Sequence, residues 1–179
     1  FNCAEPTVWL GYAESLFLRA EAALRGWGSG NPEDLYRQGV QASMDYYEIS
    51  ATEAQSYING LVALNDGTFG SGDKEKILEA IITQKWMAVF PNGNEGWAEF
   101  RRTDYPKLML PLNNASGGDV PEGHFIKRLL YPNSENSNKA FTESDMPAKN
   151  SQGRRLWWDV SDDVPSNFGN SGALLRIRR

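Results

Sequence analysis

Two carboxylates one helical turn apart, Glu95 and Glu99, are the strongest candidates for catalysis in this sequence. Glycoside hydrolases use a pair of carboxylic acids about 5 to 10 Å apart, and one turn of helix gives a separation near the low end of that range. An arginine pair follows, and Arg102 stands at a spacing that allows an ion pair with either carboxylate on a helix. Carboxylates in such a setting are more often ion-paired than catalytic. We therefore predict a structural role for them and no enzymatic activity.

Motifs of other enzyme classes are missing from the sequence. It contains no Gly-X-Ser-X-Gly elbow, no phosphate-binding glycine loop and no His-Glu-X-X-His segment. One cysteine, Cys3, and one histidine, His124, are too few for a zinc site of the usual ligand count. The oxygen-rich stretch 133–138 lacks the carboxylate order and central glycine of an EF-hand, so we expect turns there. We predict no cofactor and no metal.

The composition narrows the class of protein further. With 179 residues, 40% of them hydrophobic and 12% aromatic, the chain can bury a core. The net charge of -5 argues against a nucleic-acid partner, because binding phosphates needs a dense basic face. No apolar run approaches the roughly 20 residues of a transmembrane helix, and residues 1–8 lack the pattern of a signal peptide. We expect a globular protein.

The N-terminal part of the chain predicts a helical hairpin. Apolar residues recur at helical spacing over 11–26, and three closely spaced glycines then end that helix. Asn31 is placed to cap a second helix that runs to about Tyr47. Small residues on both helices allow a close approach like that of tetratricopeptide-type hairpins; these are Ala20, Gly39 and Ala42.

Two further helices are predicted before residue 90. One runs from Thr52 to about Leu64, and the next is capped by Asp73 and contains 77–90. The buried face of this fourth helix is predicted to hold Ile77, Ile81, Ile82, Trp86, Val89 and Phe90. Its predicted water-facing side holds Lys76, Glu79, Thr83 and Lys85. A short helix after the next turn would carry the two carboxylates and anchor Trp97 against the fourth helix.

From residue 105 onward the sequence changes in character. Prolines recur, with a glycine pair at 117–118 and the Asn- and Ser-rich stretch between them. Only short pieces such as His124–Leu130 look extended. A long segment with little regular structure is uncommon in a compact domain, and when ordered it often carries the binding site.

Aromatic rings and side-chain amides around these loops are the candidate ligand contacts. Flat rings stack on the apolar C–H faces of sugar rings, and amides hydrogen-bond to the hydroxyl groups. On this chemistry we select Tyr105, Asn113, Asn114 and Trp158 as ligand-binding residues. Each aromatic residue taken singly is more often part of a core than a ligand platform.

Several ordered segments carry a family resemblance. They are residues 12–27, 36–44, 84–86, 90–93, 95–103, 105–106, 128–138 and 155–159. Among them, 95–103 reads Glu-Gly-Trp-Ala-Glu-Phe-Arg-Arg-Thr and 155–159 reads Arg-Leu-Trp-Trp-Asp. In this order, they resemble the C-terminal half of the SusD/RagB family of outer-membrane nutrient-binding lipoproteins.

The resemblance implies an all-α fold, with tetratricopeptide-like helical hairpins followed by a long loop-rich region. It implies that 1–179 is a single fragment of one SusD-like domain, with a helical repeat-like part over 1–104 and a loop-rich part over 105–179. Residues 160–179 depart from the family pattern, and we assign them no function.

The function that the resemblance implies is capture without catalysis. A protein of this family would bind a glycan or another nutrient at the bacterial cell surface and pass it to a SusC-like TonB-dependent transporter in the outer membrane. Its membrane association would depend on an N-terminal lipid outside this sequence.

Two other classes of function stay open. A glycan-degrading enzyme would use Glu95 or Asp159 with a second carboxylate and would release product. A helical-repeat interaction module would dock a protein partner on the hairpin of residues 11–47 and would bind no small ligand.

Overall fold

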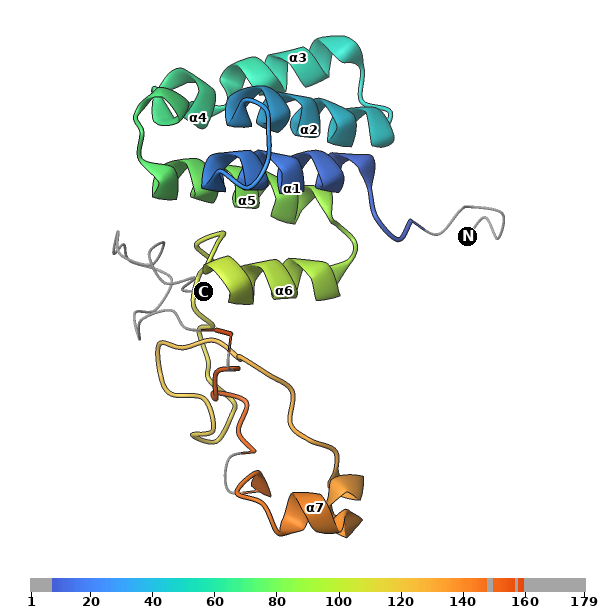
Figure 1. Ribbon diagram of the computed structural model, residues 1–179, viewed down its shortest axis with the longest axis vertical. Coiled ribbons are helices and arrows are strands. Elements are labelled where there is room, and N and C mark those ends of the chain that lie inside the picture. Colours follow the sequence, from blue (N-terminus) through green and yellow to red (C-terminus); the bar gives the residue numbers. More distant parts are fainter. Residues whose placement is uncertain (1–7, 148–149, 157, 160–179) are drawn as a thin grey trace. The chain divides into compact units, whose positions relative to one another are not determined.

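The computed structural model describes residues 8–147, 150–156 and 158–159. The chain divides into two compact units (Figure 1), which we name the helical unit, Phe1–Pro106, and the loop unit, Lys107–Arg179. The division of a single domain at 104/105 stays a prediction. The all-α prediction is confirmed, since helices are the regular elements of the described residues and no strand occurs among them.

The helical unit consists of short helices joined by tight turns. Its elements are α1 (Tyr12–Arg25), α2 (Pro32–Tyr46), α3 (Ala51–Gly60), α4 (Val62–Asn65), η1 (Thr68–Gly70), α5 (Lys74–Ala88) and α6 (Gly93–Thr103). Helix α1 packs against both α2 and α5, and α6 packs against α5. Figure 1 shows α2, α1, α5 and α6 in successive layers.

The end of α1 and the starts of α2 and α5 are where the sequence placed them. Gly26 ends α1 in the left-handed conformation, with φ 78°, and its N–H donates to carbonyls of the last turn. The Asn31 side chain accepts hydrogen bonds from the first N–H groups of α2, and Asp73 does the same for α5. These caps satisfy backbone donors that have no partner within the helix.

The third predicted helix begins earlier and ends sooner than expected. Ser50, rather than Thr52, is its cap, because the Ser50 hydroxyl accepts from the N–H of Glu53. Leu61 then takes an extended conformation, with φ -65° and ψ 120°, and divides the predicted segment into α3 and α4.

A close contact between α1 and α2 occurs at Gly39. A Cβ added to Gly39 would lie 2.8 Å from the ring of Phe17, which is only 1% exposed. The Phe17 ring also packs edge-on against Tyr36, so it has little room to retreat. Ala20 is fully buried as well, which confirms the role of small residues in bringing the two helices together.

Two residues of the fourth predicted helix were assigned to the wrong environment. Phe90 was predicted to be buried but is 71% exposed, because α5 ends at Ala88 and Phe90 lies in the turn that follows. Lys85 was predicted to face water but is 1% exposed. Its ammonium group lies among carboxylates from other helices, which periodicity within one helix cannot reveal.

The loop unit contains little regular structure, as predicted. Its described elements are η2 (Asn133–Ser137), where turns were predicted, and α7 (Lys139–Thr142), for which no element was predicted. His124–Leu130 forms no strand; the N–H groups of Lys127 and Arg128 both donate to the carbonyl of Gln152. None of the helices in the described part of the chain is long and apolar enough to cross a bilayer.

Replacing Gly39 with alanine is expected to destabilise the helical unit by about 1 to 2 kcal/mol. Overpacking costs about 1 to 3 kcal/mol, and the gain in helix propensity offsets about 0.5 to 1 kcal/mol of this. The control is Gly60→Ala in α3, where the added Cβ meets nothing within 4 Å and should be neutral or stabilising. Urea denaturation of both variants checks this, and equal effects would contradict the close contact.

Candidate functional site

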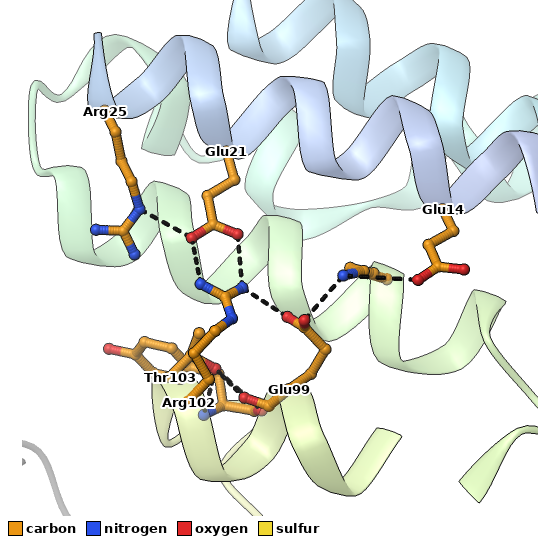
Figure 2. Close-up of polar contacts among 8 residues, drawn as sticks. Glu14, Glu21, Arg25, Glu99, Arg102 and Thr103 are labelled. Carbon is orange, nitrogen blue, oxygen red and sulfur yellow. Dashed lines mark hydrogen bonds and ion pairs between the residues drawn. The ribbon is translucent and has the colours of Figure 1, made fainter. Parts of the chain in front are cut away.

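The candidate catalytic carboxylate Glu99 is buried in an ion-pair network. Its Oε1 lies 2.9 Å from the Lys85 ammonium, and its Oε2 accepts from the Arg102 guanidinium at 2.7 Å. Figure 2 shows Glu99 of α6 facing the helices above it. The predicted pairing of Glu99 with Arg102 is therefore present, and Lys85 is a partner that the sequence did not indicate.

A second carboxylate, Glu21 of α1, completes the network. Arg102 binds it with two hydrogen bonds of 2.7 Å, one to each carboxylate oxygen (Figure 2). Arg25 donates to the same carboxylate at 2.8 Å. A two-pronged contact of this kind fixes both distance and orientation. It holds α6 against α1, although the two residues are 81 positions apart in the sequence.

Burial and pairing shift the pKa values in the network in opposite directions. Burial of Glu21 opposes its ionisation, but hydrogen bonds and charge from Arg102 and Arg25 outweigh it, and its pKa is lowered. The pKa of Glu14 is raised, chiefly by burial, and Lys85 at 3.9 Å compensates only in part. The pKa of Arg102 is raised because contacts with Glu21 and Glu99 outweigh its burial.

Two of the three carboxylates considered for catalysis, Glu99 and Asp159, are engaged in ion pairs. Glu99 is shared between two cations, and Asp159, in the loop unit, lies 3.2 Å from the ammonium of Lys127 with both side chains buried. Glu95 stands in the first turn of α6, where its N–H donates to the Asn92 cap. Each of the two ion pairs gives its carboxylate a structural role.

The contact of Trp97 with the fourth predicted helix stays a prediction, and the Trp97 ring has a partner on its own helix. The guanidinium of Arg101 lies over its ring, 3.8 Å from the ring centre. At the neighbouring Gly96, an added Cβ would lie 3.2 Å from the Trp86 ring. Trp97 is half-buried, in keeping with a structural role on α6.

The four predicted ligand contacts are divided between the two units of the chain. Tyr105 belongs to the helical unit, where its hydroxyl lies 3.0 Å from Glu75 Oε2; burial and then the Glu75 charge raise its pKa. Asn113 and Asn114 line one hollow of the loop unit. Trp158, also in the loop unit, is half-buried and lies outside that lining.

The hollow that contains the two asparagines, which we name the loop hollow, has a volume of about 350 Å³. Its lining residues are Leu110, Pro111, Asn113, Asn114, Ala115, Ser116, Val120, Glu122, Gly123, His124, Ile126 and Gln152. This size lies within the range of small-molecule sites, which are mostly apolar with a few placed polar groups. Glu122 and Gln152 were not among the predicted ligand contacts, and His124 was considered only as a metal ligand.

Asn114 and Asn113 have different roles at the loop hollow. The Asn114 amide donates to the carbonyl of Val120 at 2.6 Å and accepts from the N–H of Ser116 at 3.1 Å. Both ends of this side chain therefore hold the loop in shape. Asn113 is exposed at the rim, so its amide can reach a ligand.

A second connection holds Gln152, another lining residue of the loop hollow, in place. The Asp119 carboxylate accepts from the N–H of Gln152 at 2.7 Å, which lowers the Asp119 pKa, and its carbonyl accepts from the Ser151 hydroxyl at 3.0 Å. A Cβ on Gly153 would lie 2.7 Å from that carbonyl. The glycine thus permits the close approach of two segments more than 30 residues apart.

No three His, Cys, Asp or Glu side chains within the described ranges gather in a way that could hold a metal ion. Trp157, Cys3 and residues 160–179, which the sequence analysis also considered, lie outside the described residues.

Residues 2–132 match the family model of the SusD-like proteins. This family is described as starch-binding and associating with the outer membrane. No curated protein matches it significantly. A chitin-binding SusD homologue from Flavobacterium johnsoniae is 35% identical, with a TM-score of 0.70 over 86% of this chain and 36% of its own. SusD homologues from Bacteroides thetaiotaomicron and Bacteroides uniformis are 34% and 32% identical, with TM-scores of 0.73 and 0.71.

The matches cover most of this chain but less than half of each relative's length. The two Bacteroides structures match 89% and 87% of this chain and 40% and 38% of their own lengths. The chain therefore spans about two fifths of the proteins that it resembles.

Replacing Glu99 with glutamine is expected to destabilise the helical unit by about 3 kcal/mol, because the buried Lys85 charge loses its nearest partner. The matched control is Glu33→Gln, which breaks an exposed pair with Arg37 and should cost under about 1 kcal/mol. Chemical denaturation followed by circular dichroism measures both. Equal losses would show that the network does not support the fold.

The acid sensitivity of the fold should depend on Glu21. The pKa of Glu21 is lowered in the folded state, so its ionised side chain stabilises the protein at pH values above 4.5, its ordinary pKa. This contribution is lost as the pH falls through the pKa of the folded state. The difference in unfolding free energy between the wild type and Glu21→Gln should be largest near neutral pH and shrink below pH 4.5. A difference that stays constant down to acid unfolding would contradict the assignment.

Proposed function

The chain belongs to the SusD-like family, and from that premise we propose that the protein captures a glycan at the bacterial cell surface without breaking it. The glycan then passes to a SusC-like TonB-dependent transporter in the outer membrane. The protein stays at that membrane through an N-terminal lipid that lies outside this sequence.

The loop hollow is the part of the chain that carries this proposal. Its volume suits a small sugar segment, and its lining combines apolar side chains such as Leu110 and Ile126 with the exposed amide of Asn113. Apolar surface suits the C–H faces of sugar rings, and an amide can both donate to and accept from hydroxyl groups. The hydrogen bonds made by Asn114 and Asp119 hold this lining in place before a ligand arrives.

Binding without turnover is supported by the state of the carboxylates. Glu99 and Asp159 are engaged with buried cations, and each would have to give up an ion pair before it could act as an acid or nucleophile. Tyr105 and Trp158 remain proposed ligand contacts, with the Tyr105 ring contributing a face because its hydroxyl is already engaged.

The proposed transporter contact uses the helical unit. This unit exposes large apolar side chains, among them Trp27 at 67% and Val62 at 72%. Exposed apolar surface of this kind often marks a protein contact. The same observation favours the second candidate function, a helical-repeat module whose main role is to dock a protein partner.

Calorimetric titration of the full-length protein with maltoheptaose and chitohexaose tests the proposal, with chromatography of the sugar afterwards. We expect binding of at least one oligosaccharide and recovery of the intact sugar. Asn113→Ala should weaken binding about three- to tenfold, the effect of losing one net hydrogen bond. The control is Asn59→Ala, which removes an exposed amide from α3.

The other outcomes of this experiment separate the alternatives. Shortened sugar chains would contradict capture and favour the enzyme that uses Glu95 or Asp159. Unchanged affinity in Asn113→Ala would contradict sugar binding at the loop hollow. Unchanged affinity in Tyr105→Ala would contradict a ligand contact at Tyr105. No binding of either sugar, together with co-purification of a transporter, would favour the protein-docking module.

A further inference from the structure

Gln152 stands in a turn of the loop unit, yet its backbone is engaged on both sides. Its N–H donates to the Asp119 carboxylate at 2.7 Å. Its carbonyl accepts from the N–H groups of Lys127 and Arg128, at 2.8 and 3.3 Å. A hydrogen bond from an N–H to a carboxylate is among the stronger kinds. These three bonds, made to two places in the chain, fix the position of Gln152.

The neighbours of Gln152 hold the same turn in place. The Ser151 hydroxyl donates to the carbonyl of Asp119 at 3.0 Å. The Asn150 side chain accepts from the N–H of Tyr131 at 2.9 Å. Gln152 therefore cannot shift without breaking bonds that its neighbours make as well.

A buried ion pair strengthens the connection on the carbonyl side of Gln152. The Lys127 ammonium lies 3.2 Å from Asp159 Oδ2, and the two side chains are 9% and 2% exposed. A buried charge is costly without its partner, so this pair keeps Lys127 where its N–H meets the Gln152 carbonyl.

The side-chain amide is the polar group that Gln152 can offer to a ligand. Gln152 lines the loop hollow and is half-buried. Its backbone groups are used, and within the described ranges its side chain makes no hydrogen bond. Asn113 and Glu122, which line the same hollow, are exposed. A half-buried amide has already lost part of its water, so a bond to a ligand costs it little further desolvation.

From this geometry we propose that Gln152 is a ligand-binding residue of the loop hollow and that Asp119 is the positioning residue that holds it. The Gln152 amide carries a donor and an acceptor side by side, so it can bond to two neighbouring polar groups of one sugar ring. Asp119 does not line the hollow and acts through the N–H of Gln152. The ligand class rests on the proposed capture function, and the choice of residues rests on the contacts within the loop unit.

Calorimetric titration of the full-length protein with maltoheptaose and chitohexaose tests the role of Gln152. Gln152→Ala should weaken binding about three- to tenfold, the effect of losing one net hydrogen bond. The control is Gln38→Ala, which removes an exposed amide from α2 in the other unit and should leave the affinity unchanged. In nuclear magnetic resonance spectra, the side-chain NH₂ signal that disappears in Gln152→Ala should shift saturably as sugar is added to the wild type.

A second set of variants tests the role of Asp119. Asp119→Ala removes the acceptor of the Gln152 N–H and should weaken binding at least about twofold. Asp119→Asn keeps an oxygen that can accept the same bond and should restore most of the affinity. When Gln152→Ala is already present, Asp119→Ala should add no further loss, because Asp119 acts through Gln152. A general effect on folding would lower the affinity in both backgrounds.

The remaining outcomes overturn separate parts of the account. Unchanged affinity in Gln152→Ala, with a loss in Asn113→Ala, would overturn the role of Gln152 and leave capture at the loop hollow standing. A further loss on adding Asp119→Ala to Gln152→Ala would overturn the positioning role of Asp119. Absence of binding by the wild type would overturn the proposed capture function and the role of Gln152 together.

Discussion

The buried ion-pair network around Glu99 is the interaction on which the arrangement of the helical unit depends. It joins Glu21 of α1, Lys85 of α5 and Arg102 of α6 in one set of contacts. Only one large apolar side chain of α6, Phe100, is buried, so α6 has little hydrophobic surface of its own to hold it in place. Because any of these charges would be costly to bury alone, α6 is held in the position where all of them are matched.

The network also explains why conspicuous acidic residues do not indicate hydrolysis. Glu99 is within ion-pair distance of both Lys85 and Arg102, and these contacts would have to break before its carboxylate could reach a substrate. The loop hollow offers the exposed amide of Asn113 and apolar side chains such as Leu110 and Ile126. These are groups that hold a ligand and do not transform it, which agrees with the character of the family.

Much of the fold could be predicted from local sequence, because caps, turns and helical periodicity act over a few residues. The starts of α2 and α5 and the end of α1 follow from Asn31, Asp73 and Gly26 alone. Family resemblance then identified the fold class, since the ordered segments span both units. Contacts between distant residues left no such local signal.

The environments that were predicted wrongly depend on distant partners. Lys85 looks like any polar residue on a helix surface, and its carboxylates lie on α1 and α6. Asn114, whose role as a ligand contact stays a prediction, donates from its amide to the Val120 carbonyl, a partner that local sequence does not indicate. Gln152 meets Asp119 at the loop hollow only when two distant segments of the loop unit have packed.

The most direct test of the account is a crystal structure of the full-length protein with an oligosaccharide bound. The account predicts an intact sugar at the loop hollow, with the bonds from Glu99 to Lys85 and Arg102 unchanged. A sugar whose glycosidic oxygen lies within hydrogen-bond reach of Glu99 or Asp159, or a cleaved product beside either residue, would contradict it.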